Sequence, residues 1–316
     1  MLEISTSELK KLMGAHKPFI LLDCRGVDYY NWEHLPHAIN LRWKYIQSRA
    51  EKMFPDKTTL IITSCDGFAC NASVRCYENL KKLGFTNLLE YSGGISDWAA
   101  HGEPTEKDKR YRIAENIYRF PEQKFYEESV GSYLIETDDS VTLIDGPQNL
   151  TEEHEDFILH FGKPIQIFLS HGPTGGASEI LQKQHGAKIY LHKADAANNW
   201  LRVKPNVLFE DGFAFAKHLT VIHTPGHTPG SSTLYDRKNK LLFTGDHIQG
   251  NKQGTIYDFI KNDDGVSGNP TERLKSAKKL LEYEFDAILP FHYDMILGNA
   301  KAQLTSFIST YEHNHN

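Results

Sequence analysis

The sequence has little cysteine, no long apolar run and no excess of positive charge. Four cysteines among 316 residues are too few for a disulfide framework. No apolar stretch approaches the roughly 20 residues that span a bilayer, and residues 1–13, MLEISTSELKKLM, lack the basic and apolar regions of a signal peptide. The formal net charge of −6 argues against a nucleic-acid partner, because phosphate binding requires clustered Lys and Arg. We therefore expect a cytoplasmic protein with no membrane or nucleic-acid partner.

Length and local composition predict two domains. A chain of 316 residues exceeds the usual size of one compact core. The charged stretch HGEPTEKDKRYR, residues 101–112, contains Gly and Pro and has no apolar period, which is typical of a linker. We expect domains at 1–104 and 112–316, joined by a linker at 105–111.

The two segments differ in their secondary-structure patterns. In the first, the continuous apolar runs PFILLD (18–23) and TLIITS (59–64) indicate buried parallel strands, and an amphipathic helix is predicted over 72–83. This alternation predicts a small α/β domain. In the second, short strand patterns between residues 132 and 245 are interrupted by helical ones, such as that of residues 178–185, which predicts an αββα sandwich.

Cys65 lies at a position that favours sulfur chemistry. It directly follows the strand-like TLIITS, and a helix is expected to begin near Asn71 or Ala72. The loop CDGFAC between them is short, so its backbone N–H groups are expected to turn inward beside a helix N-terminus, which lowers the pKa of a thiol. A thiolate at this place could accept sulfur as a persulfide and pass it on.

Residues 4–103 resemble a single rhodanese (sulfurtransferase) domain. The resemblance is carried by LLDCRGVDYYNWEHLPHAINL and KKLGFTNLLEYSGGISDWAAHG, and it implies by position that Cys65 is the catalytic cysteine. The commonest loop of that family ends in Arg where this chain has Cys70, which leaves the sulfur donor open. Cys70 either resolves a persulfide on Cys65 or fills space. We predict that Cys24 and Cys76 are buried core thiols.

The 16 histidines point to a second site. Residues 223–231 are HTPGHTPGS and residues 241–247 are LLFTGDH. A histidine in a Gly/Pro turn after one strand, followed by an aspartate that ends the next, is typical of a metal site at a sheet edge.

Residues 111–300 resemble the metallo-β-lactamase fold superfamily. The matching stretches are GSYLIETDDSVTLIDGP with Asp145, HTPGHTPGS with His227, LLFTGDH with Asp246 and ILPFHYD with His292. The central motif of that family, H-x-H-x-D-H, belongs directly after IQIFLS, where this chain keeps only His171. The second His, the Asp and the last His of the motif are replaced by Pro173, Gly175 and Gly176. A dinuclear zinc hydrolase is therefore not expected.

The sequence is still compatible with a site for one metal ion. His171, His227 and Asp246 supply two imidazoles and one carboxylate, the set that suits Fe(II) with open positions for dioxygen and substrate. The persulfide dioxygenases of this superfamily, which oxidise a persulfide to sulfite and are sometimes fused to rhodanese domains, bind one iron with residues that align to these three. We expect His292 to complete or replace a ligand and Asp145 to orient a loop. His223 and His247 are expected to pack beside the ligands, and His185 and His192 to lie on the surface.

The sequence thus predicts a sulfur-metabolism enzyme. Cys65 carries sulfane sulfur, and the second domain uses one divalent metal, Fe(II) before zinc, to oxidise or hydrolyse a thiol-linked substrate. The expected partner is a small thiol, a persulfide or another sulfane-sulfur donor, and self-association into a homo-oligomer is open. Two alternatives stay open as well: the second domain is a metal-free module for binding or dimerisation, or a metal-dependent hydrolase of a small thioester-like molecule.

Overall fold

The computed structural model describes residues 1–315 except 16–17, 108–110, 121–122, 126–127 and 261–267. The contacts between described residues divide the chain into two compact units, residues 1–112 and 113–316. Residues 108–110 of the expected linker lie outside the described residues. No helix in the described part of the chain is long and apolar enough to cross a membrane.

The first unit is built on a parallel sheet with the strand order β2-β1-β3-β4. Its strands are β1 (Ile20–Asp23), β2 (Ile39–Asn40), β3 (Ile61–Ser64) and β4 (Leu88–Tyr91). Its helices are α1 (Thr6–Gly14), α2 (Val27–Trp32), α3 (Ile46–Met53), α4 (Ala72–Lys82) and α5 (Gly94–Ala100), with a 3-10 turn η1 (Trp43–Tyr45).

Successive side chains of β1, β3 and β4 pack into two different cores. Leu22 of β1 packs with Ala50 of α3 and Leu80 of α4, whereas its neighbour Leu21 packs with Leu9 of α1 and Trp98 of α5. Because alternate residues of a strand point to opposite faces, this arrangement buries both faces of the sheet. It explains why these strands are continuous apolar runs in the sequence.

The second unit contains two facing sheets in the described residues, with the strand orders β13-β12-β11-β10-β9-β6-β5 and β14-β15-β16-β17-β18-β19, and a separate β7-β8 pair. The strands of the first sheet and the pair are β5 (Arg112–Ala114), β6 (Ile117–Arg119), β7 (Gln123–Phe125), β8 (Glu128–Val130), β9 (Tyr133–Glu136), β10 (Val141–Ile144), β11 (Ile165–Phe168), β12 (Lys188–His192) and β13 (Val207–Phe209). Those of the second sheet are β14 (Ala214–Ala216), β15 (Leu219–His223), β16 (Ser232–Asp236), β17 (Leu241–Gly245), β18 (Ala287–Pro290) and β19 (Ile296–Leu297). The helices are α6 (Glu152–His160), α7 (Ser178–His185), α8 (Pro270–Leu280) and α9 (Ala300–His315), with the 3-10 turns η2 (Gly172–Gly175) and η3 (Lys193–Asp195).

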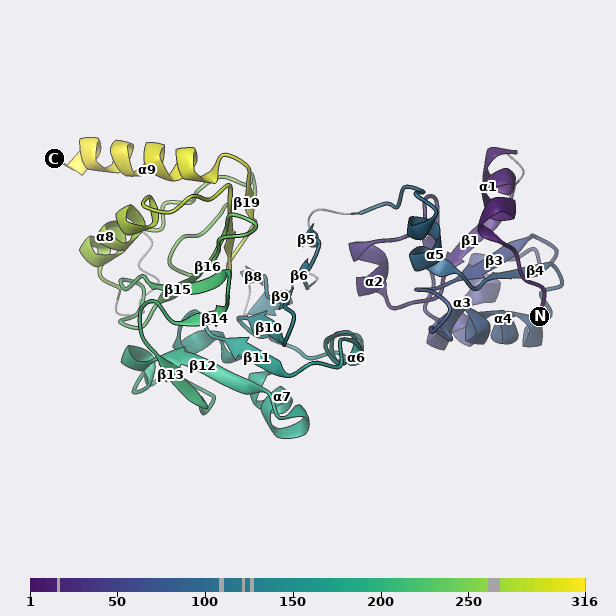
Figure 1. Ribbon diagram of the computed structural model, residues 1–316, viewed down its shortest axis with the longest axis horizontal. Coiled ribbons are helices and arrows are strands. Elements are labelled where there is room, and N and C mark those ends of the chain that lie inside the picture. Colours follow the sequence, from purple (N-terminus) through teal and green to yellow (C-terminus); the bar gives the residue numbers. More distant parts are fainter. Residues whose placement is uncertain (16–17, 108–110, 121–122, 126–127, 261–267, 316) are drawn as a thin grey trace. The chain divides into compact units, whose positions relative to one another are not determined.

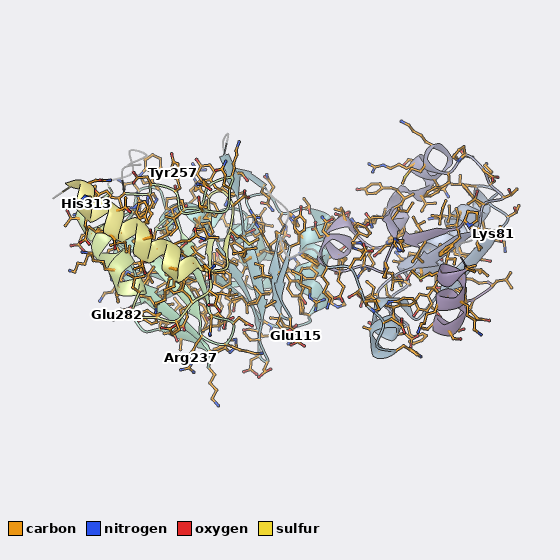
Figure 2. All side chains as sticks on the ribbon, turned by 90° about the horizontal axis from the view of Figure 1, so that it is seen from above. Lys81, Glu115, Arg237, Tyr257, Glu282 and His313 are labelled. Atoms are coloured by element: carbon orange, nitrogen blue, oxygen red, sulfur yellow. The ribbon has the colours of Figure 1, made fainter. Side chains whose placement is uncertain are left out.

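The core of this unit lies between the two sheets. Phe168 of the first sheet belongs to one buried cluster with Leu234 and Phe243 of the second. Helices α8 and α9 cover the outer face of the second sheet through Leu280 and Leu304, and α6 and α7 lie beside the first sheet (Figure 1). The predicted αββα sandwich is therefore confirmed, as is the α/β fold of the first unit. Exposed charged side chains such as Lys81, Arg237 and Glu282 project from the outside of the two units (Figure 2).

Candidate functional site

The cysteine loop of the first unit is anchored by the start of α5. Cys65 follows β3 directly, and its carbonyl accepts a hydrogen bond of 3.2 Å from the N–H of Ile95. Gly94 has φ 58°, and a Cβ at this position would lie 2.5 Å from the carbonyl oxygen of Cys65. Only glycine fits there, because the backbones meet directly and the conformation is left-handed. The second glycine of the sequence YSGGISDW, Gly94, is thus a packing requirement of the cysteine loop.

The two thiols of this loop have different surroundings. Cys65 is 1% exposed, and its Sγ lies 3.5 Å from the carbonyl oxygen of Cys70 and 3.2 Å from Oγ of Ser73. Its hydrogen bond to Cys70 and its burial raise the pKa of the Cys65 thiol. The neighbouring Cys65 lowers the pKa of Cys70 to about 6, against the effect of its partial burial.

An arginine does reach the loop, although the loop itself has none. The Arg25 guanidinium is buried; it contacts Oδ2 of Asp23 at 2.7 Å and Oδ1 of Asp66 at 3.2 Å. Asp66 follows Cys65, so this pairing fixes the start of the loop to the end of β1. Cys24 and Cys76 are fully buried, as expected for core thiols.

The second unit brings His171, His227 and Asp246 together. His171 follows β11, His227 lies in the turn after β15 and Asp246 directly follows β17, so all three stand at the same end of the sandwich. One ligand atom from each lies within 4.8 Å of the other two, and all three side chains are buried. Nε2 of His171 is 3.1 Å from Oδ2 of Asp246, and Nε2 of His227 is 3.6 Å from the same oxygen. Among the described residues, this is the one group whose His, Cys or acidic side chains are placed to share a metal ion.

The donor set fits one divalent cation. Oδ1 of Asp246 is buried and has no hydrogen-bond partner among the described residues. Burial raises the pKa of Asp246, but the neighbouring His292 and His171 lower it more, so the carboxyl group is ionised. Burial and the nearby His171 lower the pKa of His227 to about 3, which keeps its imidazole neutral. Burial lowers the pKa of His171, but the neighbouring Asp246 raises it more, so a bound cation would take the place of a proton there. A carboxylate and neutral imidazoles are the protonation states that bind metal.

His292 stands at the edge of this group. Its Nε2 lies 3.6 Å from Oδ2 of Asp246, and its backbone forms a bridge with Val130 beside the β7-β8 pair. It is not a member of the three-residue group. Of the four metal ligands expected from the sequence, the structure places three in mutual reach and the fourth next to the carboxylate.

The turn after His171 excludes the side chains of a second metal site. The backbone forms the 3-10 turn η2, and Gly176 follows with φ 47°. A Cβ at Gly176 would lie 2.6 Å from the carbonyl oxygen of Pro147, and one at Gly175 would lie 3.0 Å from Cγ1 of Val203. The last histidine of the motif therefore does not fit at Gly176, and an aspartate at Gly175 would require the side chain of Val203 to shift.

Asp195 is a functional candidate that the sequence analysis missed. Its carboxylate is fully buried; it accepts hydrogen bonds from the N–H of Gly172 at 2.9 Å, the hydroxyl of Thr228 at 2.7 Å and the N–H of Gly230 at 2.7 Å. Gly172 follows His171, and Thr228 follows His227. Asp195 thus joins the two loops that carry the imidazoles. The feature of the sequence that could have indicated Asp195 is its position just after the strand β12. This strand lies next to β11 in the sheet, and His171 follows β11.

Three further contacts orient the site. The N–H of Ser170 donates to Oδ1 of Asp145 at 2.8 Å, which agrees with the expected orienting role of this aspartate. Oγ of Ser170 lies 3.0 Å from Nδ1 of His171, so the other ring nitrogen faces Asp246. Arg273 of α8, also missed, is buried and donates to the carbonyl oxygen of Asp246 at 2.7 Å.

The remaining histidines differ partly from expectation. His192 was expected on the surface but is 4% exposed, because its ring stacks on that of His223 with centroids 3.9 Å apart. His223 in turn contacts the carbonyl oxygen of Pro229 at 2.8 Å and supports the turn that holds His227. His185 is half-buried and contacts Glu155 of α6 at 2.5 Å. His247 is fully buried, and burial lowers its pKa well below the usual value.

Two protein families match the chain. Residues 5–101 match the rhodanese-like domain, and residues 175–298 match the metallo-beta-lactamase superfamily. The metallo-beta-lactamase of Pontibacter korlensis has a similar fold, with a TM-score of 0.51 and 18% sequence identity over 64% of this chain and 97% of that one. At this identity the likeness concerns the fold alone.

Relatives with known names match parts of the chain. The acyl-coenzyme A thioesterase MBLAC2 of Gallus gallus is 31% identical over 111 residues, which cover 33% of this chain and 37% of the relative. A hydroxyacylglutathione hydrolase of Xylella fastidiosa is 29% identical over 177 residues, 53% of this chain and 60% of the relative. The adenylyltransferase and sulfurtransferase uba4 of Ogataea parapolymorpha is 25% identical over 96 residues, 30% of this chain and 24% of the relative. The chain thus spans less than two thirds of each of these relatives.

Proposed function

The chain joins a rhodanese-like domain to a metallo-beta-lactamase domain, and from this pairing we propose an enzyme of sulfur metabolism that acts on small thiol-linked molecules. The cysteine loop of residues 65–70 accepts sulfane sulfur. The group of His171, His227 and Asp246 holds a single divalent metal and acts on the persulfide of a small thiol. Thiols of this kind need a reducing compartment, so the proposal keeps the cytoplasmic location expected from the sequence.

The observation that carries the proposal is the convergence of two imidazoles on an ionised carboxylate whose second oxygen has no hydrogen-bond partner among the described residues. Two imidazoles and one carboxylate favour Fe(II), with zinc as the alternative. When bound, such an ion supplies open coordination positions at which a thiol-linked substrate and dioxygen can meet. The turn at Gly175 and Gly176 supports one ion rather than two.

The protein groups around the site have positioning roles in this proposal. Ser170 and Asp145 fix the ring of His171, and Asp195 holds the loops of His171 and His227 at a constant separation. Arg273 anchors the backbone of Asp246 from α8. Such outer contacts orient ligands and tune their affinity.

A second candidate function is hydrolysis of a small thioester. Its specific support is the names of two relatives, an acyl-coenzyme A thioesterase and a hydroxyacylglutathione hydrolase. This candidate uses the same three ligands and differs in the reaction. A third candidate, a metal-free domain for binding or dimerisation, is supported only by the shortened histidine motif.

The test compares the reactions on one preparation. The full chain is purified without oxygen, and oxygen consumption with glutathione persulfide is measured beside hydrolysis of an acyl-glutathione thioester. His227→Ala tests the metal group, and His160→Ala, a change at an exposed histidine of α6, is the matched control. Oxygen consumption that is lost in His227→Ala and kept in His160→Ala supports persulfide oxidation. Thioester hydrolysis that is lost in His227→Ala and kept in His160→Ala supports the second candidate function instead. Activity that survives in His227→Ala overturns both candidate functions.

A further inference from the structure

We propose that Ser73 and Glu90 form a proton relay to Cys65. When Cys65 takes up sulfane sulfur, its proton moves to the hydroxyl of Ser73 while the hydroxyl proton of Ser73 moves to the carboxylate of Glu90. This relay rests on the proposed function in one respect, that Cys65 accepts sulfane sulfur. It adds two residues to that function, and both lie outside the cysteine loop of residues 65–70.

Hydrogen bonds join the three side chains in a row. Sγ of Cys65 lies 3.2 Å from Oγ of Ser73, and Oγ of Ser73 donates to Oε1 of Glu90 at 2.7 Å. Because Ser73 uses its one hydroxyl hydrogen for the carboxylate, its oxygen faces Cys65 as an acceptor, and the thiol is the donor of the first bond. Thiol, hydroxyl and carboxylate thus stand in the order in which a proton can travel from the sulfur to a base.

Three elements of the first unit bring these side chains together. Cys65 follows β3, Glu90 lies in the neighbouring strand β4 and Ser73 is in the first turn of α4. Thr63, two residues before Cys65, is the register partner of Glu90, so the side chains of Cys65 and Glu90 leave the sheet on the same face. Helix α4 packs on this face with Cys76, and Ser73 lies three residues earlier on the same side of the helix. The fold therefore fixes the relay from both sides.

Glu90 is an acidic residue at a position that otherwise suits an apolar one. Its side chain is 2% exposed, and the described residues give its carboxyl group one partner, the hydroxyl of the buried Ser73. Burial of a carboxylate without a cation beside it costs free energy, so acidic side chains are rare at such positions. A base held one hydroxyl away from a reactive thiol is a function that accounts for this cost.

The other oxygen neighbours of the Cys65 sulfur cannot pass a proton on. They are the carbonyl oxygens of Gly67 at 3.8 Å and Cys70 at 3.5 Å. A carbonyl oxygen accepts a hydrogen bond but carries no hydrogen of its own. Among the oxygen neighbours of this thiol in the described residues, the Ser73 hydroxyl is thus the one that both accepts and donates.

The relay balances over the cycle of sulfur transfer. In uptake, the Cys65 sulfur attacks the terminal sulfur of a persulfide R–S–SH. A new S–S bond forms on Cys65, the bond to R–S breaks and R–S⁻ leaves with the electron pair, while Glu90 becomes a neutral acid. When an acceptor thiolate then attacks the outer sulfur of Cys65–S–SH, the Cys65 thiolate that leaves recovers its proton from Glu90 through Ser73. The cycle consumes no oxidant or reductant.

The experiment measures how fast Cys65 reacts in the full chain between pH 6.5 and pH 8.5. Iodoacetamide, which alkylates thiolates and does not itself titrate, is used beside glutathione persulfide as the sulfur donor. Fragmentation of the modified peptide in a mass spectrometer separates products on Cys65 from those on Cys70. Ser73→Ala and Glu90→Gln interrupt the relay. Ser64→Ala is the matched control, because Ser64 is also buried, directly precedes Cys65, and has a hydroxyl without a hydrogen-bond partner among the described residues.

An internal proton acceptor predicts a flat pH profile. In the unchanged chain and in Ser64→Ala, the rate of Cys65 alkylation should vary by less than about threefold over this range. In Ser73→Ala and Glu90→Gln it should be about tenfold or more lower at pH 6.5 and rise about tenfold per pH unit, because the proton then leaves to solvent. Sulfur uptake from glutathione persulfide at pH 6.5 should fall about tenfold or more in the same two variants.

Two results overturn the relay. One is the same pH profile of alkylation in all four proteins; the other is a loss in Ser73→Ala and Glu90→Gln that does not recover at pH 8.5, which leaves both residues a structural role only. The proposed function fails in a different way. If no persulfide forms on Cys65 of the unchanged chain while the alkylation profiles differ as expected, the relay to the thiol is supported and the uptake of sulfane sulfur is refuted.

Discussion

The carboxylate of Asp195 accepts a hydrogen bond of 2.7 Å from the hydroxyl of Thr228, the residue after His227. The same carboxylate accepts one from the N–H of Gly172, the residue after His171. We predict that Asp195→Asn lowers the affinity for a divalent metal about 10–100-fold, because the two ligand loops lose their common anchor. It is also expected to lower the free energy of unfolding by about 2–4 kcal/mol, since an amide N–H₂ then faces buried donors.

The control for this prediction is Asp236→Asn. Asp236 is equally buried and accepts backbone N–H groups from Lys238 and Asn239 in the turn after β16, away from the ligand loops. Competition with a chelator measures the metal affinity, and urea unfolding measures the stability. An equal loss of affinity in both variants would reduce the role of Asp195 to general stability.

Restoring two of the three missing motif residues, at positions 175 and 176, should not create a second metal site. Gly176→His is expected to lower the free energy of unfolding by at least about 2 kcal/mol, because Gly176 has φ 47° and a Cβ would meet the carbonyl oxygen of Pro147. The double change Gly175→Asp and Gly176→His should therefore keep the metal content of the unchanged chain. A gain of a second equivalent of metal, measured by mass spectrometry of the metal, would show that the turn adapts.

The glycine beside the cysteine loop should be irreplaceable. We predict that Gly94→Ala destabilises the first unit by about 2–4 kcal/mol, since its Cβ would lie 2.5 Å from the carbonyl oxygen of Cys65. Gly102 also has a positive φ, 73°, but a Cβ there meets nothing within 4 Å, so Gly102→Ala should cost only about 1 kcal/mol. Thermal unfolding measures the loss of stability in both variants. Equal losses would contradict a steric conflict between a Cβ at position 94 and the carbonyl oxygen of Cys65.

Acid should weaken the second unit through His192. Burial and the neighbouring His223 lower the pKa of His192 to about 4, below its ordinary value of 6.5. A group with a depressed pKa in the folded state contributes stability above its unfolded pKa and loses it as the pH falls through the window from 6.5 to 4. Between pH 7 and pH 4 the free energy of unfolding should fall by about 1–3 kcal/mol more in the unchanged chain than in His192→Gln. Urea unfolding at each pH measures this difference. If the free energy of unfolding changed with pH by the same amount in both proteins, this role of His192 would be refuted.

The fold and the ligand residues were largely predictable from the sequence. His171, His227 and Asp246 each follow a strand with a largely apolar pattern, so sheet geometry brings them to one edge. The loss of motif residues after His171 could also be recognised from the sequence. The close approach of this turn to Pro147 could not be predicted from the sequence, because it depends on the backbone conformation of Gly176.

What the sequence did not show depends on contacts between distant segments. Asp195 lies next to the ligand loops only because β12 neighbours β11, and the strand order is not written in the spacing of residues. The burial of His192 requires the ring of His223 from another sheet.

The most direct test of the account is the metal content of the chain after purification without oxygen. The account predicts about one equivalent of iron or zinc per chain, lost in His227→Ala and in Asp246→Ala but retained in His160→Ala. Less than a tenth of an equivalent after reconstitution with Fe(II) or Zn²⁺, or two equivalents, would contradict a single-metal site at His171, His227 and Asp246.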